Sequence, residues 1–100
     1  MSYDPGALNS ALSAAVGDDA ALISDLRFAF MESAERQVDL LGRARCDANW
    51  SLAAWRLKGL AASFGLTGLM ALADEAATSA PGDPRILRRL RAVLEGLKQD

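Results

Sequence analysis

The chain has no histidine among its 100 residues and only one cysteine. Without histidine it has no imidazole to act as a nucleophile, a proton shuttle or a metal ligand. Cys46 has no second thiol for an intramolecular disulfide and no neighbouring ligands for a metal ion. We therefore expect neither a metal nor a cofactor, and we interpret Cys46 as a buried or half-buried free thiol in a reducing cytoplasm.

The sequence also lacks an excess of charge and any long apolar run. It has 11 basic and 13 acidic side chains, so it offers no basic field for a nucleic acid. No uninterrupted apolar stretch approaches the ~20 residues of a membrane span. The first residues do not have the basic start and apolar core of a secretory signal. We expect a cytoplasmic protein without a nucleic-acid or membrane partner.

What the chain does contain is apolar residues at helical spacing. Hydrophobic residues make up 51% of it, enough for one small core, so we expect a single domain over residues 1–100. Turn and capping residues divide the chain into helices, and no segment has the pattern of a strand. The expected helices cover about residues 6–15, 19–45, 50–64, 67–79 and 84–98.

The expected helix boundaries rest on capping residues. An aspartate or asparagine can accept hydrogen bonds from the free amides of a first turn, and proline is tolerated there. The candidate N-caps are Asp4 before Pro5, Asp18 or Asp19, Asp47 or Asn49, and Asp83 before Pro84. Gly65 is expected to close the helix over 50–64, because glycine accepts the left-handed conformation common just past a helix end.

Apolar stripes on these helices predict how they pack. The residues expected to face inward are Leu8, Leu12, Ala15, Ile23, Leu26, Phe30, Ala34, Val38, Leu41, Leu69, Leu72, Ala73, Ala76, Leu87, Leu90, Leu94 and Leu97. Amphipathic helices joined by short loops bury such stripes against one another. We predict an all-α fold, an up-down-up-down four-helix bundle with a short additional N-terminal helix laid across one end.

The helix expected over 50–64 has two contrasting faces when its residues are placed at about 100° intervals. The apolar arc contains Trp50, Ala53, Ala54, Leu57, Leu60, Ala61 and Phe64. Trp55 falls near the opposite pole, where a bundle cannot bury it. Its neighbours on the outer arc are Ser51, Leu52, Arg56, Lys58, Gly59 and Ala62.

This outer arc is a candidate binding surface. Gly59 inside a helix costs about 1 kcal/mol relative to alanine. Beside Trp55, the small residues Gly59 and Ala62 leave a flat, shallow depression where another surface can approach. Exposed aromatics rimmed by small and basic residues are typical of interfaces, although a single exposed apolar residue requires no function.

The same segment resembles the signature of the histidine-containing phosphotransfer (HPt) domain family, with Trp55 in the place of the histidine. The matching residues are Ala54, Leu57, Lys58, Gly59 and Gly65. Phe30 and the pair Asn49-Trp50 extend the resemblance, which spans about residues 8–97. HPt domains relay a phosphoryl group between receiver-domain aspartates through an exposed histidine in the middle of the third helix.

Trp55 cannot carry this chemistry, because an indole nitrogen is only a hydrogen-bond donor. Ser51 and Ser63 are nearby hydroxyls without an evident base. The resemblance implies that the docking surface remains: Lys58 matches the family lysine that flanks the phosphoryl group, and its charge can attract a receiver's acidic pocket. Phe28 and Met31, on the outer side of the helix over 19–45, add a hydrophobic contact unless they pack against the first helix.

We therefore expect a non-enzymatic phosphorelay protein that binds a response-regulator receiver domain or a histidine kinase as a regulator, itself a monomer or weak homodimer. Two alternatives stay open: a structural, self-associating helical module with Trp55 at a homodimer interface, and a histidine-replaced variant of an active phosphotransfer protein. The basic helix over 84–98 is either a solvated face or a secondary site for an acidic partner. Its basic residues are Arg85, Arg88, Arg89, Arg91 and Lys98.

Overall fold

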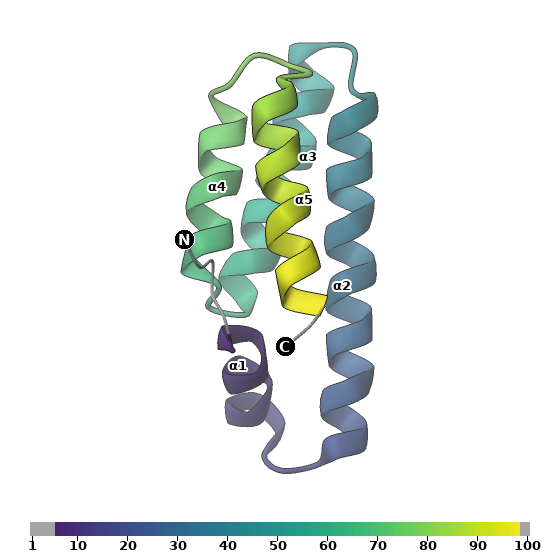
Figure 1. The fold of residues 1–100 in the computed structure, drawn as a ribbon, viewed down its shortest axis with the longest axis vertical. Helices are drawn as coiled ribbons and strands as arrows, with labels where there is room; N and C mark the ends of the chain where they lie inside the picture. The colour runs from purple at the N-terminus through teal and green to yellow at the C-terminus, as the bar shows by residue number, and fades with distance from the viewer. Residues whose placement is uncertain (1–5, 99–100) are drawn as a thin grey trace.

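The computed structural model describes residues 6–98, and over these residues the protein is all-α, without a strand (Figure 1). The five helices are α1 (Ala7–Val16), α2 (Ala20–Arg43), α3 (Asp47–Ser63), α4 (Thr67–Ala77) and α5 (Pro84–Lys98). The predicted all-α class and the predicted number of helices are confirmed. Among the described helices, none combines the length and the apolar character that crossing a membrane would require.

Helices α2 to α5 lie side by side, and each runs antiparallel to the one before it (Figure 1). Contacts join α2 to α3, α3 to α4, α4 to α5, and α5 back to α2. Helix α2 extends beyond the other three, and α1 packs against this N-terminal part of α2 (Figure 1). The outer faces of α3 and α5 thus point away from a shared core.

The core consists of the apolar faces of all five helices. Buried residues include Leu8 and Leu12 of α1, Phe30, Ala34, Val38 and Leu41 of α2, Leu69, Leu72, Ala73 and Ala76 of α4, and Leu87, Leu90, Leu94 and Leu97 of α5. These residues were expected to face inward and do so. Ile23 and Leu26 are only half-buried, and Ala15 is exposed. Ala15 departs from the expectation because the last turn of α1 approaches the corner at Gly17.

Arg27 ties three helices together near the C-terminal end of α5. Its guanidinium donates to the side-chain oxygen of Asn9 on α1, and to the carbonyl oxygen of Leu97 on α5 at 2.9 Å. The Leu97 carbonyl belongs to the last turn of α5, where carbonyl groups have no partner within the helix. Arg27 therefore supplies a hydrogen-bond donor to a carbonyl group at the end of α5, and it also holds α1 against α2.

Two of the predicted N-caps are confirmed by hydrogen bonds. Asp19 Oδ1 accepts from the backbone N–H of Leu22 at 3.0 Å, and Asp83 Oδ1 accepts from that of Arg85 at 2.9 Å. The predicted Asp4 cap lies outside the described residues. Asp18, the alternative to Asp19, precedes the cap.

The start of α3 differs from the prediction. The helix begins at Asp47, so Cys46 is the N-cap and neither Asp47 nor Asn49 caps the helix. Asp47 lies in the first turn instead, where the positive end of the helix dipole stabilises its carboxylate. The predicted burial of Cys46 is also wrong: the residue is exposed, because it belongs to the connection between α2 and α3, and connections run over the surface.

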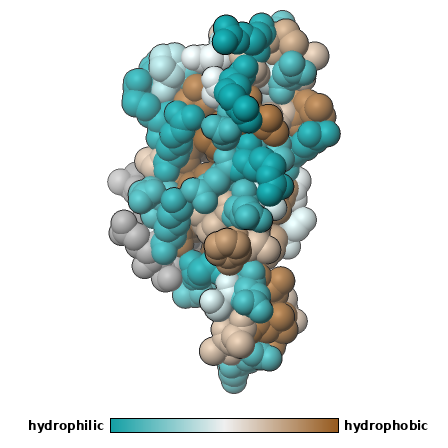
Figure 2. Space-filling view, turned by 90° about the vertical axis from the view of Figure 1, so that its right-hand side faces the viewer, coloured by the Kyte–Doolittle hydropathy of each residue, from teal (hydrophilic) through white to brown (hydrophobic). Residues whose placement is uncertain are grey.

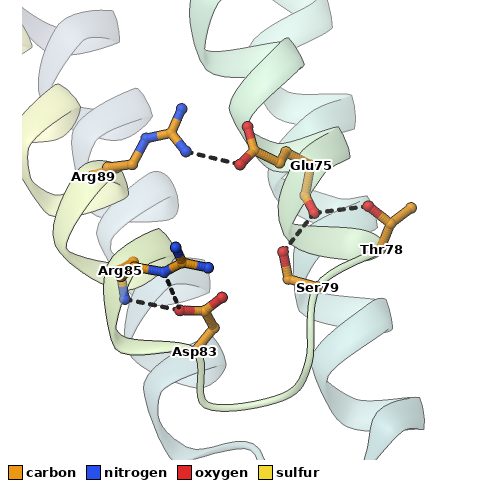
Figure 3. A network of polar contacts seen from close by, with 6 residues as sticks. All are labelled: Glu75, Thr78, Ser79, Asp83, Arg85 and Arg89. Carbon is orange, nitrogen blue, oxygen red and sulfur yellow. Dashed lines mark hydrogen bonds and ion pairs between the residues drawn. The ribbon is translucent and has the colours of Figure 1, made fainter.

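The turn between α4 and α5 is closed by hydroxyl and carboxylate groups (Figure 3). The Thr78 and Ser79 hydroxyls both donate to the carbonyl oxygen of Glu75, at 3.0 and 2.9 Å, so α4 ends at Ala77 rather than at the expected residue 79. The Glu75 carboxylate accepts from the Arg89 guanidinium at 2.8 Å, which joins α4 to α5 above the turn.

Candidate binding surface on the third helix

The inner face of α3 is fixed by packing and by one buried hydrogen bond. Trp50 is 1% exposed, and its indole N–H donates to the carbonyl oxygen of Ala76 on α4 at 2.6 Å. At the other end of α3, the Phe64 ring meets Phe30 of α2 edge to face, with 4.8 Å between the ring centroids. These contacts set the rotation of α3, and so decide which side chains point outward.

A Schellman motif ends α3, as expected from Gly65. The N–H of Gly65 donates to the Ala62 carbonyl at 3.1 Å, and the N–H of Leu66 to the Ala61 carbonyl at 3.0 Å. Gly65 has φ of 66°, the left-handed conformation that favours glycine. The reversal turns the chain into α4, which places α4 beside the outward-facing residues of α3.

We define the outer α3 surface as Ser51, Leu52, Trp55, Arg56, Lys58, Gly59 and Ala62. Trp55 is 54% exposed and Leu52, one turn earlier, is 48% exposed. Arg56, Gly59 and Ala62 are also exposed, whereas Ser51 and Lys58 are half-buried. The predicted outward position of Trp55 is confirmed. That these residues bind a partner stays a prediction.

Lys58 is held by two contacts on the outer α3 surface. Its ammonium nitrogen lies 4.9 Å from the centroid of the Trp55 ring and 3.0 Å from Oδ1 of Asp74 on α4. A cation over an exposed aromatic face gains about 0.5–1 kcal/mol. Lys58 thus packs against the indole while an acidic side chain neutralises its charge. Sequence reasoning did not find Asp74.

Gly59 has no role in packing within the described chain. A Cβ atom added to it would meet no atom within 4 Å, and its backbone is helical. The Ser63 hydroxyl donates to the Gly59 carbonyl oxygen at 3.0 Å, a contact that any residue at position 59 could accept. The space above Gly59 is therefore open to solvent. No packing contact within the described chain explains why a glycine, which lowers helix stability, occupies this position.

Two shallow grooves flank Trp55. One, of about 350 Å³, lies between α2 and α3 and is lined in part by Leu52 and Arg56. The other, of about 260 Å³, lies between α3 and α4 and is lined in part by Lys58 and Asp74. Trp55 lines neither groove; on α3 it lies between Leu52, which lines the first, and Lys58, which lines the second.

Phe28 and Met31 do not join this surface. Met31 is buried and belongs to the core, so its expected outer position is wrong. Phe28 is 70% exposed, but it lines a separate groove with Glu35 of α2 and Lys98 of α5. In this groove the Lys98 ammonium nitrogen lies 2.8 Å from the Glu35 carboxylate. This hydrogen bond and ion pair raise the pKa of Lys98.

The α2 side of the molecule is mainly hydrophilic and shows separate hydrophobic patches rather than one continuous apolar face (Figure 2). The outer face of α5 is basic, but Glu75 pairs with Arg89 and Asp83 lies 3.7 Å from Arg85. Among the exposed large hydrophobic residues of the described chain, Leu52 and Trp55 share one helix face.

Within residues 6–98, no group of three histidine, cysteine or acidic residues is arranged to hold a metal ion. Comparison of the chain with known protein families, curated proteins and solved structures gave no match. Any function for the outer α3 surface therefore has to be argued from its own residues.

Proposed function

We propose that this chain is an HPt-like protein of two-component phosphorelay signalling that binds a response-regulator receiver domain, or a related histidine kinase, without accepting phosphate. In this proposal α2 to α5 form the up-down-up-down four-helix bundle of that family, α1 is its short N-terminal addition, and the protein works in the cytoplasm. It has no enzymatic activity of its own. It acts by occupying the docking face of its partner.

The observation that carries the proposal is an exposed tryptophan beside an open glycine. By the resemblance, Trp55 takes the place of the family's phospho-accepting histidine; it lies in the middle of α3 and is more than half exposed. Gly59, one turn later, leaves space for an approaching backbone or side chain. Tryptophan is among the commonest residues to dominate binding energy at interfaces. The surface thus suits docking and lacks a nucleophile for transfer.

Titration of a panel of receiver domains, prepared with and without the phosphoryl mimic beryllofluoride, tests the proposal. We expect at least one receiver to bind, and Trp55→Ala to weaken that binding by about tenfold or more, as expected of a central interface residue. Phe28→Ala is the matched control, because it removes another exposed aromatic from a different groove. We expect its affinity to stay within about twofold of wild type.

The proposal fails if no receiver or histidine kinase binds, or if Trp55→Ala binds as tightly as wild type. Equal losses in Trp55→Ala and Phe28→Ala would also contradict it, since they would indicate that binding does not use the outer α3 surface in particular.

A second candidate function, self-association, is favoured by the adjacent exposure of Leu52 and Trp55 on one turn of α3. Two copies could bury this pair against each other. Light scattering of wild type and Trp55→Ala over a range of concentrations separates the two functions. A dimer that Trp55→Ala abolishes supports self-association, and a wild-type monomer at all concentrations excludes it.

A further inference from the structure

Lys58 does not lie free on the outer α3 surface, and this changes what the surface offers a partner. Its ammonium is shared between the indole face of Trp55 and the carboxylate of Asp74, at 4.9 and 3.0 Å. An ammonium carries three N–H donors, and a carboxylate at 3.0 Å is a charge-assisted acceptor for one of them. Any acidic group that approaches Lys58 meets the Asp74 carboxylate at the same site.

We infer that Asp74 is a specificity-determining residue of the outer α3 surface, where its carboxylate competes with the acidic groups of a partner for Lys58. This inference rests on the proposed function. With Asp74 in place, the surface presents Trp55 as an apolar ridge and keeps the neighbouring cation neutralised. A receiver that docks by apolar contact is favoured over one that depends on its acidic pocket or its phosphoryl group.

The position of Asp74 explains why it competes directly. It projects from α4 across the groove between α3 and α4, which it lines together with Lys58. Both side chains are partly exposed, so a partner can reach the ion pair without unfolding any helix. Like charges disfavour close approach at an interface, so Asp74 also repels an incoming carboxylate or phosphoryl group. Removing its charge relieves both effects.

Glu75 supplies a matched control on the next residue of α4. Its carboxylate is paired with Arg89 of α5 at 2.8 Å (Figure 3). The adjacent acidic residue, Asp74, pairs with Lys58 of α3. Asp74→Asn and Glu75→Gln each remove one negative charge from the same helix. Only Asp74→Asn releases Lys58. A difference between these variants therefore reports a local competition and not the net charge of the protein.

The first experiment needs no protein partner. We would follow the Lys58 ε-methylene signals by NMR while inorganic phosphate is added; we expect the Trp55 ring current to shift these signals upfield, because the Lys58 ammonium lies over the ring. We expect Asp74→Asn to respond at Lys58 at a phosphate concentration at least about twofold lower than wild type, because breaking an exposed ion pair changes affinity by a few fold. Glu75→Gln should titrate like wild type. Identical titrations of wild type and Asp74→Asn would overturn the competition.

The second experiment uses the receiver that binds in the titration described above. We expect Asp74→Asn to bind it about two- to fivefold more tightly, with a steeper dependence on salt and a larger preference for the beryllofluoride form. Glu75→Gln should match wild type in all three. Unchanged affinity in Asp74→Asn overturns the inference and leaves the proposed function standing. If no receiver binds at all, the proposed function fails, and the phosphate titration alone decides whether Asp74 competes for Lys58.

Discussion

The two tryptophans of α3 lie five positions apart and have opposite environments. Trp50 is sealed in the core and donates a hydrogen bond to α4, whereas more than half of Trp55 is open to solvent. A residue on the inner face is constrained by the helices around it. A residue on the outer face is compatible with the fold almost whatever its identity. The fold therefore tolerates a tryptophan where the resembled family has its reactive histidine. In the proposed function, this difference affects binding rather than packing.

Trp50→Ala is the variant expected to separate the two tryptophans most clearly, by its loss of stability. We expect the free energy of unfolding to fall by about 3–5 kcal/mol, the usual cost of truncating a buried large aromatic. The Ala76 carbonyl oxygen would also lose its indole donor. Urea denaturation followed by circular dichroism measures the loss. Trp50→Phe is the control, since it keeps most of the volume and removes the hydrogen bond. A loss below about 1 kcal/mol in Trp50→Ala would contradict the assigned burial.

Gly65→Ala is expected to give the next largest loss of stability. Gly65 ends the helix with φ of 66°, where a side chain costs about 1–2 kcal/mol. A Cβ there would meet no atom within 4 Å, so the expected loss in Gly65→Ala comes from the backbone alone. Thermal or urea denaturation gives the value. If Gly65→Ala were as stable as wild type, the assignment of a left-handed backbone conformation to Gly65 would be wrong.

The division of α3 into two faces could be predicted from the sequence because it depends on local spacing alone. Helical periodicity places Trp50 and Trp55 correctly without knowledge of any other helix. The same holds for Asp19 and Asp83, whose caps act over two or three residues. Gly65 was found for the same reason, since a Schellman motif lies within six residues.

Features that depend on neighbouring helices could not be predicted. The ion pair between Lys58 and Asp74 joins residues 16 positions apart, and it requires α4 to have one particular rotation against α3. Met31 was misplaced because its burial depends on the helices that pack against α2, which local spacing does not give. Cys46 was misplaced because its exposure depends on its position in the connection between two helices, just before α3 begins at Asp47.

Gly59→Ala separates stability from binding on the outer face. Gly59 is helical and open, so alanine should raise the free energy of unfolding by about 1 kcal/mol. Gly96 in α5 is equally open, and Gly96→Ala should stabilise the protein to a similar degree. Only Gly59→Ala adds a methyl group beside Trp55, so only this variant should weaken receiver binding. Equal binding by both variants would show that Gly59 does not serve close approach.

Trp55→Ala is expected to have the smallest effect on stability. The lost contact with Lys58 is worth about 0.5–1 kcal/mol, and the better helix propensity of alanine returns about 0.5 kcal/mol. The free energy of unfolding should therefore change by less than about 1 kcal/mol in the same urea experiment, several times less than for Trp50→Ala. A loss as large as that of Trp50→Ala would mean that Trp55 supports the fold, and weakened binding in Trp55→Ala would then no longer identify a docking surface. A small change in stability with a large loss of binding is what an outer face free of packing constraints predicts.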